Sequence, residues 1–161
     1  MNTNRLSLRD VEEADLSYFF DHEQDPEAGH MAAFTPEDPS DREAFTEHWT
    51  RLLANNTIIK RTIVMDDTVV GHIASWVQEG DREITYWIDR SQWGKGVATT
   101  ALQLFLTEVE IRPLFARASR DNIGSIRVLE KNGFEVIGED RGYANARGAE
   151  IDELVLSLTT P

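Results

Sequence analysis

The sequence predicts an α+β fold, a mixed sheet with helices on its faces, and three observations lead to that prediction. Segments with the alternating or β-branched pattern of strands are interleaved with segments that repeat apolar residues at helical spacing. Their predicted order is β-α-α-β-β-β-α-β-α-β-β, which combines hairpins with helical connections. The chain has 161 residues, of which 40% are hydrophobic, enough to bury one core. We therefore expect residues 1–161 to form a single domain.

The strand predictions follow from alternation, β-branched residues and turn signals. Asp66-Asp67 and Glu79-Gly80-Asp81 are expected to turn the chain between neighbouring strands, and a polar hairpin is expected around 145–148. The predicted strands lie at residues 5–9, 57–65, 68–77, 83–88, 113–118, 134–137 and 150–158.

The helix predictions follow from apolar stripes and capping residues. We expect Asp10 to cap the first helix and Ser40–Glu43 to form a capping box before the second. The apolar stripe of residues 97–109 predicts a third helix, and Asp121 or Asn122 is expected to cap a fourth that ends at Asn132-Gly133. The segment 25–39, with three prolines, is expected to be an irregular loop.

Composition and charge restrict the possible functions. The net charge is -13, from 16 Lys and Arg against 29 Asp and Glu, which disfavours nucleic acid and favours cationic partners such as amines. The absence of cysteine excludes disulfides, thiolate metal sites and a cysteine nucleophile. No apolar run is long enough to span a membrane and no secretory signal is evident, so we expect a cytoplasmic protein. The histidine spacing predicts no metal site, and no G-x-S-x-G serine motif occurs.

The most informative segment is the glycine loop at residues 91–99, which lies between a predicted strand and a predicted helix. Gly94 and Gly96 allow close approach to the amino end of the helix, where unpaired N–H groups attract a pyrophosphate. Lys95 and Thr99 could add donors. The spacing is neither that of a nucleotide P-loop nor that of a dinucleotide fingerprint. A tight turn with a helix cap is the structural alternative.

The element order and two motifs resemble the GNAT superfamily of N-acetyltransferases. Trp93–Thr99 resembles that family's acetyl-CoA loop, [QR]-x-x-G-x-[GA], with Gly96 and Ala98 at the small positions. Trp93 replaces the usual Gln or Arg, a departure similar to the RimJ/RimL-like branch, which acetylates protein N-terminal amines and other small amines. Asn122–Phe134 resembles the second cofactor-binding motif, N-x-x-[AS]…E-K-x-G-F. The resemblance covers nearly all of the chain and is weakest between residues 23 and 39.

This resemblance implies a mixed, mostly antiparallel seven-stranded sheet with helices on both faces, and acetyl-CoA as co-substrate. The strand containing Tyr86 is expected to splay from its neighbour, so that its free backbone groups pair with pantetheine, while the Asn122 side chain bonds the same arm. The residues implied to bind the cofactor are Trp87, Ile88, Trp93, Gly94, Lys95, Gly96, Val97, Ala98, Thr99, Asn122 and Ser125.

The predicted chemistry is direct attack of a neutral amine on the thioester in a ternary complex. Glu83 is the first candidate base, because RimJ/RimL-like sequences carry an acidic residue there, with His72 and His30 as alternatives. Backbone N–H groups near Ile88 would polarise the thioester carbonyl. The family's usual acidic Tyr is replaced by Leu129, so Ser125 is the candidate acid, or else it only bonds the cofactor.

Several alternatives remain open at this stage. A CoA-binding sensor without turnover, a structural interaction domain and an enzyme using another donor such as succinyl-CoA are compatible with parts of the pattern. The acceptor could be a peptide N-terminus or a small amine. Exposed strand edges in the closing hairpin could pair in a homodimer.

Overall fold

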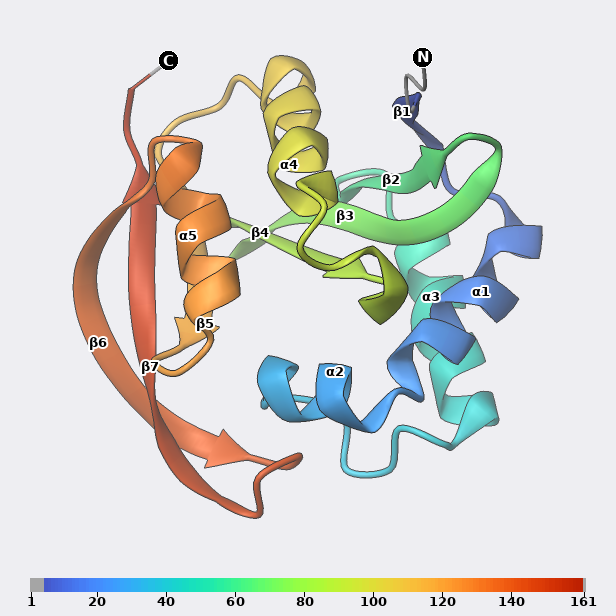
Figure 1. Cartoon of the computed structure of the whole chain (residues 1–161), viewed down its shortest axis with the longest axis horizontal. Coiled ribbons are helices and arrows are strands. Elements are labelled where there is room, and N and C mark those ends of the chain that lie inside the picture. The colour runs from blue at the N-terminus through green and yellow to red at the C-terminus, as the bar shows by residue number, and fades with distance from the viewer. Residues whose placement is uncertain (1–4, 161) are drawn as a thin grey trace.

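The computed structural model describes residues 5–160 and contains a seven-stranded sheet with the order β1-β2-β3-β4-β5-β7-β6 (Figure 1). Neighbouring strands are antiparallel except β4 and β5, which are parallel. The strands are β1 Leu6–Asp10, β2 Ile59–Met65, β3 Thr68–Gln78, β4 Asp81–Ile88, β5 Leu114–Ser119, β6 Glu135–Ala144 and β7 Ala149–Leu158.

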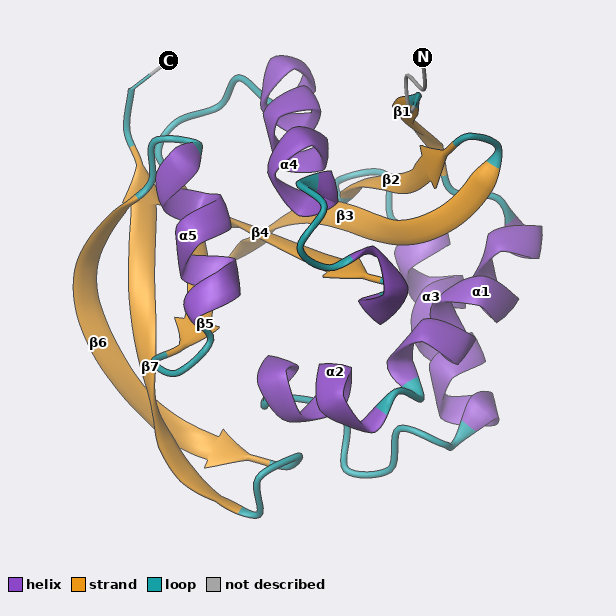
Figure 2. Ribbon diagram, in the orientation of Figure 1, coloured by secondary structure: helices purple, strands orange, loops and turns teal. Residues whose placement is uncertain are grey.

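Helices cover both faces of this sheet (Figure 2). α4 and α5 pack on one face, while Phe19 of α1 and Trp49 of α3 contact His72 of β3 on the other. The predicted α+β class and the mostly antiparallel seven-stranded sheet are confirmed. The α-helices are α1 Leu16–Glu23, α2 Pro26–Ala32, α3 Arg42–Ala54, α4 Val97–Glu108 and α5 Ile123–Lys131, and short 3₁₀ turns lie at Glu13–Asp15 and Arg90–Gln92.

Local predictions in the first quarter of the chain were wrong in three places. Asp10 does not cap a helix but ends β1, where it pairs with Arg61. The expected loop at 25–39 contains α2, because Asp25 caps its amino end and Pro26, at the first helical position, needs no N–H partner there. Asp41, not Ser40, caps α3 by accepting from the Ala44 amide at 3.0 Å.

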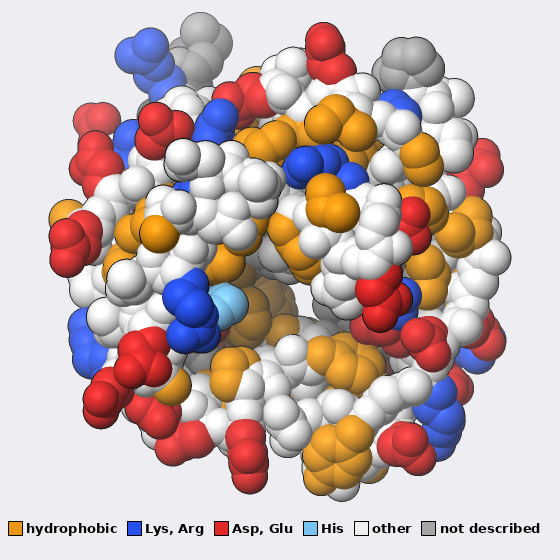
Figure 3. Space-filling view, turned by 180° about the vertical axis from the view of Figure 1, so that it is seen from behind, with side chains coloured by type: hydrophobic (Ala, Val, Ile, Leu, Met, Phe, Trp, Pro, Cys, Tyr) orange, Lys and Arg blue, Asp and Glu red, His pale blue; other side chains and the backbone are white. Residues whose placement is uncertain are grey.

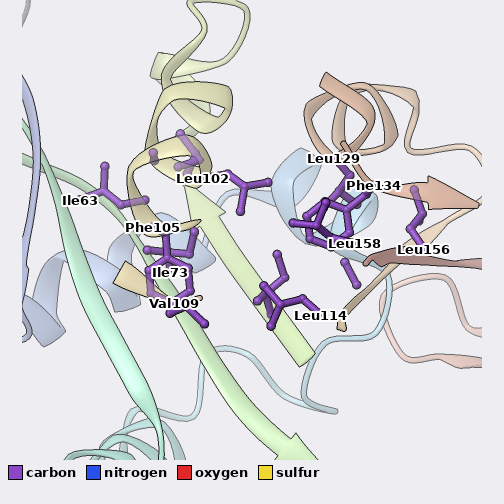
Figure 4. Packing of buried hydrophobic residues seen from close by; sticks show 14 of the residues in the cluster. Ile63, Ile73, Leu102, Phe105, Val109, Leu114, Leu129, Phe134, Leu156 and Leu158 are labelled. Atoms are coloured by element: carbon purple, nitrogen blue, oxygen red, sulfur yellow. The ribbon is translucent and has the colours of Figure 1, made fainter. Parts of the chain in front are cut away.

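The hydrophobic core continues across both halves of the sheet (Figure 4). Leu102 and Phe105 of α4, the helix that packs against β1, β3 and β4, are fully buried, and Leu129 of α5 is buried in the same cluster as Phe134 and Leu158. α4 therefore holds one half of the sheet and α5 the other, and β4 and β5 meet at the boundary between them. Among residues 5–160, no helix is both long and apolar enough to cross a membrane.

A buried carboxylate fixes the corner between β1 and α1. Asp15 is 3% exposed, and its carboxylate accepts four hydrogen bonds. Two come from the guanidinium of Arg9 at 2.7 and 2.8 Å, one from the Thr62 hydroxyl at 2.7 Å and one from the Glu12 backbone N–H at 2.8 Å. Burial alone would raise the pKa of Asp15, but these donors together lower it. The carboxylate is therefore held in its charged form.

Candidate functional site

The two parallel strands in the middle of the sheet separate after a short ladder. β4 and β5 pair only at Arg82 with Leu114 and at Glu83 with Phe115. Beyond Glu83, β4 continues to Ile88 with β3 on one edge and, within residues 5–160, no strand ladder on the other. An extended ligand can pair with such an open edge as an added strand. We call this opening, along residues 84–88, the β4 slot.

The amino end of α4 lies at one end of the β4 slot and is built to receive an anion. Gly94 and Gly96 have φ values of 75° and 77°, and a Cβ on either would meet no atom within 4 Å. The first helical bond of the α4 turn runs from the Thr100 amide to the Gly96 carbonyl, so the Val97, Ala98 and Thr99 amides precede it. These donors and the helix dipole favour a negative charge at this end.

Three of the other helices are capped by their own side chains, whereas, within residues 5–160, α4 and α1, which continues directly from the 3₁₀ turn Glu13–Asp15, are not. α2, α3 and α5 are capped by their own Asp25, Asp41 and Asn122 side chains at 2.9, 3.0 and 3.2 Å. In α4 no side chain among the described residues caps the helix, and its first turn carries no acidic residue. The positive end of α4 is therefore available to a ligand.

Trp93 connects the glycine loop to β4. Its indole N–H donates to the Ile88 carbonyl at 3.0 Å, and the residue is 41% exposed. The indole thus anchors the loop at the end of the β4 slot, while Gly94, Lys95 and Gly96 are exposed beyond it. The side-chain Nδ2 of Asn132, at the carboxyl end of α5, donates to the Thr99 carbonyl of α4 at 3.3 Å, which links the two helices.

The α5 side of the slot carries a hydroxyl pair. The Tyr86 hydroxyl from β4 and the Ser125 hydroxyl from α5 are 2.8 Å apart. Asn122 uses its side chain inside the protein: its Oδ1 accepts the Ser125 amide, and its Nδ2 donates to the Met31 carbonyl at 3.3 Å. Leu129 is 1% exposed in the core and offers no polar group.

Tyr86 is the residue that sequence reasoning missed, because only the backbone of its strand was given a role. Strand alternation from Ile84 and Ile88, both buried under α4, places Tyr86 on the same face. That signal could have directed attention to its hydroxyl. Burial raises the pKa of Tyr86 to about 12, partly offset by the hydrogen bond with Ser125.

Glu83 lies on the opposite face of β4 from Tyr86. Side chains alternate between the two faces of a strand, and these residues are three positions apart in a ladder without a bulge. It is 9% exposed, and its Oε1 is 3.5 Å from Nε of Arg117. Arg117 also contacts Asp140 and Glu153 at 3.0 Å each. Burial raises the pKa of Glu83, and Arg117 opposes that shift. The structure therefore does not bring Glu83 and Ser125 together but places them on the two sides of β4.

His72, an alternative base candidate, lies on the same face of the sheet as Glu83. The His72 ring packs 4.7 Å from Phe19 and 5.1 Å from Trp49, and its Nε2 is 3.9 Å from a Glu23 oxygen. Trp87 lies across from His72 in the ladder, and among the described residues neither its indole N–H nor the His72 nitrogens has a hydrogen-bond partner.

His30 belongs to α2 and lines a cavity of about 360 Å³ between α1, α2 and the loop before α3. None of the predicted cofactor-binding residues lines that cavity. Seen from behind the view of Figure 1, the surface of the molecule is hollowed near its middle (Figure 3). His30 therefore belongs to a different concavity from the glycine loop.

Comparisons with known proteins identify relatives of this chain. The acetyltransferase (GNAT) domain profile matches residues 5–135. The chain is 28% identical over 166 residues to an uncharacterized N-acetyltransferase, p20, of Bacillus licheniformis, covering 97% of this chain and 93% of that protein.

Solved structures share the whole fold. Mycobacterium smegmatis RimJ in complex with CoA-disulfide superposes with a TM-score of 0.78 at 25% identity, covering 96% of this chain and 82% of that one. Spermidine N-acetyltransferase from Vibrio cholerae, solved with CoA and spermine, superposes with a TM-score of 0.82 at 16% identity, covering 96% of this chain and 95% of that one. With its profile match over most of its length, the chain belongs to the GNAT acetyltransferase family.

Proposed function

We propose that this protein transfers the acetyl group of acetyl-CoA to a primary amine. The observation that carries the proposal is the β4 slot, which opens beside the uncapped amino end of α4. A pyrophosphate joined to a linear amide-containing arm fits that combination, because one part needs N–H donors at a helix end and the other an open strand edge.

The fit to acetyl-CoA can be stated residue by residue. The amides of residues 94–99 would hold the pyrophosphate, and a Cβ at Gly94 or Gly96 would project into the open space in front of them. Lys95 is exposed beside them and would add a positive charge. The β4 edge from Tyr86 to Ile88 would hold the pantetheine arm, with Trp93 anchoring its outer end. Asn122 would contribute by shaping the α5 wall, since its polar atoms already bond Ser125 and Met31.

In this proposal acetyl-CoA supplies an acyl group activated as a thioester. The amine approaches from the Glu83 face of β4, and Glu83 takes its proton directly or through water. The C–N bond forms as the C–S bond breaks, and the electron pair of the C–S bond stays on sulfur. Backbone N–H groups of β4 near Ile88 stabilise charge on the carbonyl oxygen. Ser125, on the other face, stabilises the departing sulfur.

The charge around Glu83 favours a cationic acceptor. Three carboxylates, those of Glu83, Asp140 and Glu153, surround the single Arg117 guanidinium, which leaves two negative charges in excess when all are ionised. The whole chain carries -13, so an approaching ammonium is attracted over a longer range as well. We infer that peptide N-termini and polyamines are the acceptor classes to test first. Trp93 in the glycine loop favours the RimJ/RimL-like branch.

The test is a thiol-release assay with acetyl-CoA and a panel of peptides, polyamines and aminoglycosides, run beside Gly96→Glu. Release that depends on an amine in the native protein and is lost in the variant supports the proposal. CoA binding without release from any amine would support a sensor instead, a function that the lack of a hydroxyl at Leu129 favours. Faster release from succinyl-CoA would reassign the donor.

A further inference from the structure

We propose that Tyr86 is a positioning residue that orients the Ser125 hydroxyl, so that Ser125 donates a hydrogen bond to the leaving sulfur. The inference rests on the proposed function and adds to it a residue that carries no assigned side-chain role. It addresses how a site with a buried leucine at position 129 stabilises a departing thiolate.

The geometry places the hydroxyl pair where the inference needs it. Tyr86 belongs to β4 after the ladder with β5 has ended, and Ser125 belongs to the first turn of α5. Their oxygens are 2.8 Å apart, so the pair links β4 to α5 beside the β4 slot. Both side chains are partly buried, which strengthens a hydrogen bond between them.

The direction of the hydrogen bond decides what Ser125 can do. Each hydroxyl has one hydrogen, and either atom could be the donor by geometry alone. A phenol is a stronger donor than an aliphatic hydroxyl, which favours Tyr86 as the donor and the Ser125 Oγ as the acceptor. Within residues 5–160, the Ser125 Oγ has no other hydrogen-bond partner. Its own hydrogen then remains free to point into the slot.

The ionisation of Tyr86 is consistent with this direction. Burial raises its pKa to about 12, so the phenol keeps its hydrogen throughout the neutral range. Tyr86 therefore acts as a fixed donor and does not exchange a proton with Ser125. The proton released by the amine leaves through Glu83, and the thiolate takes its proton from water, so Ser125 supplies a hydrogen bond and remains unchanged.

The first readout is the pKa of the thiol of protein-bound CoA. It is measured from the ultraviolet absorbance of the thiolate as the pH is varied, and it requires no turnover. A hydrogen bond donated to the thiolate lowers that pKa. We expect Ser125→Ala to raise it by about one unit, the effect of one charge-assisted bond. Tyr86→Phe keeps Ser125 but frees its rotation, so we expect a rise of roughly half a unit. The double variant should match Ser125→Ala, because Tyr86 acts only through Ser125.

The second readout is the split between kcat and KM. Tyr86→Phe should lower kcat about three- to fivefold and leave the KM for acetyl-CoA unchanged, since the lost interaction strengthens only as charge develops on sulfur. Ser125→Thr, which keeps a hydroxyl, should recover most of the loss seen in Ser125→Ala. Tyr143→Phe, at a tyrosine that is 61% exposed, is the matched control and should behave as the native protein.

Three results would overturn the inference. In the first, Ser125→Ala shifts the pKa of the bound CoA thiol but Tyr86→Phe leaves it at the native value. In the second, the two shifts add in the double variant. The third is a stability loss in Tyr86→Phe with no change in thiol pKa, which would make the bond purely structural. These outcomes differ from failure of the proposed function, in which the native protein itself shows no CoA binding or no acetyl transfer.

Discussion

Replacing Gly96 tests the anion site at the amino end of α4 most directly. In the free protein, Gly96→Ala costs only the strain of a side chain at φ 77°, about 1 kcal/mol, because the new Cβ meets nothing within 4 Å. For a chain of this size the melting temperature should fall by about 3 °C. The Cβ would, however, stand in front of the amides that we assign to the pyrophosphate.

The expected loss of affinity is much larger than the loss of stability. Displacing the diphosphate from one N–H donor removes a bond to a charged group, roughly 1.5–3 kcal/mol, so the Kd for CoA should rise at least tenfold in Gly96→Ala. Gly96→Glu adds a carboxylate about 4 Å from two negative charges. Each pair costs about 1 kcal/mol at this exposed loop, which brings the total to 100-fold or more.

Isothermal calorimetry of CoA binding measures these changes, and a second glycine provides the control. Gly80, in the β3–β4 turn, has φ 85° and equally open surroundings, so Gly80→Ala and Gly80→Glu should lose the same stability as the Gly96 variants and keep native affinity. If Gly96→Glu bound CoA within twofold of Gly80→Glu, the diphosphate would not lie at α4 and the reasoning would be refuted.

Three further predictions concern the rest of the site and its support. Glu83→Gln should lower kcat about 100-fold. Because the folded-state pKa of Glu83 is raised, native kcat/KM should climb at a pH above the ordinary glutamate value of 4.5. Over the same pH range the stability of the native protein should fall as pH rises, and the stability of Glu83→Gln should not. Asp15→Asn should cost about 2 kcal/mol in urea unfolding at pH 7, because it weakens the charge-assisted hydrogen bonds from Arg9. Because the folded-state pKa of Asp15 is lowered, this difference should shrink as the pH falls below the ordinary aspartate value of 3.8, and a constant difference would contradict its charge. Gly71→Ala should lower the free energy of unfolding by about 1–3 kcal/mol and weaken CoA binding, because its Cβ would overlap the Trp87 carbonyl oxygen. Gly138→Ala, in an open strand position, is the control, and an equal loss of stability in both variants would exclude the clash.

Periodicity and turn chemistry in the sequence determined the seven strands, four of the five helices and the position of the glycine loop. These features depend on local physics: the stripe from Val97 to Phe105 needs a helix to bury it, and Gly133, at φ 93°, suits the end of α5 as predicted. α2 was missed because a helix of seven residues next to three prolines gives a weak pattern, although Asp25-Pro26 is a capping signal. The motifs around Gly96 and Asn122 identified the family without any structure.

Tertiary structure alone decided which side chains meet. Nothing local to Glu83 specifies that Arg117 of another strand lies 3.5 Å away, or that the two faces of β4 separate it from Ser125. The contact between Tyr86 and Ser125 joins residues 39 positions apart and depends on where β4 and β5 part. Register and strand separation arise from packing across the whole sheet, so they are absent from any short stretch of sequence.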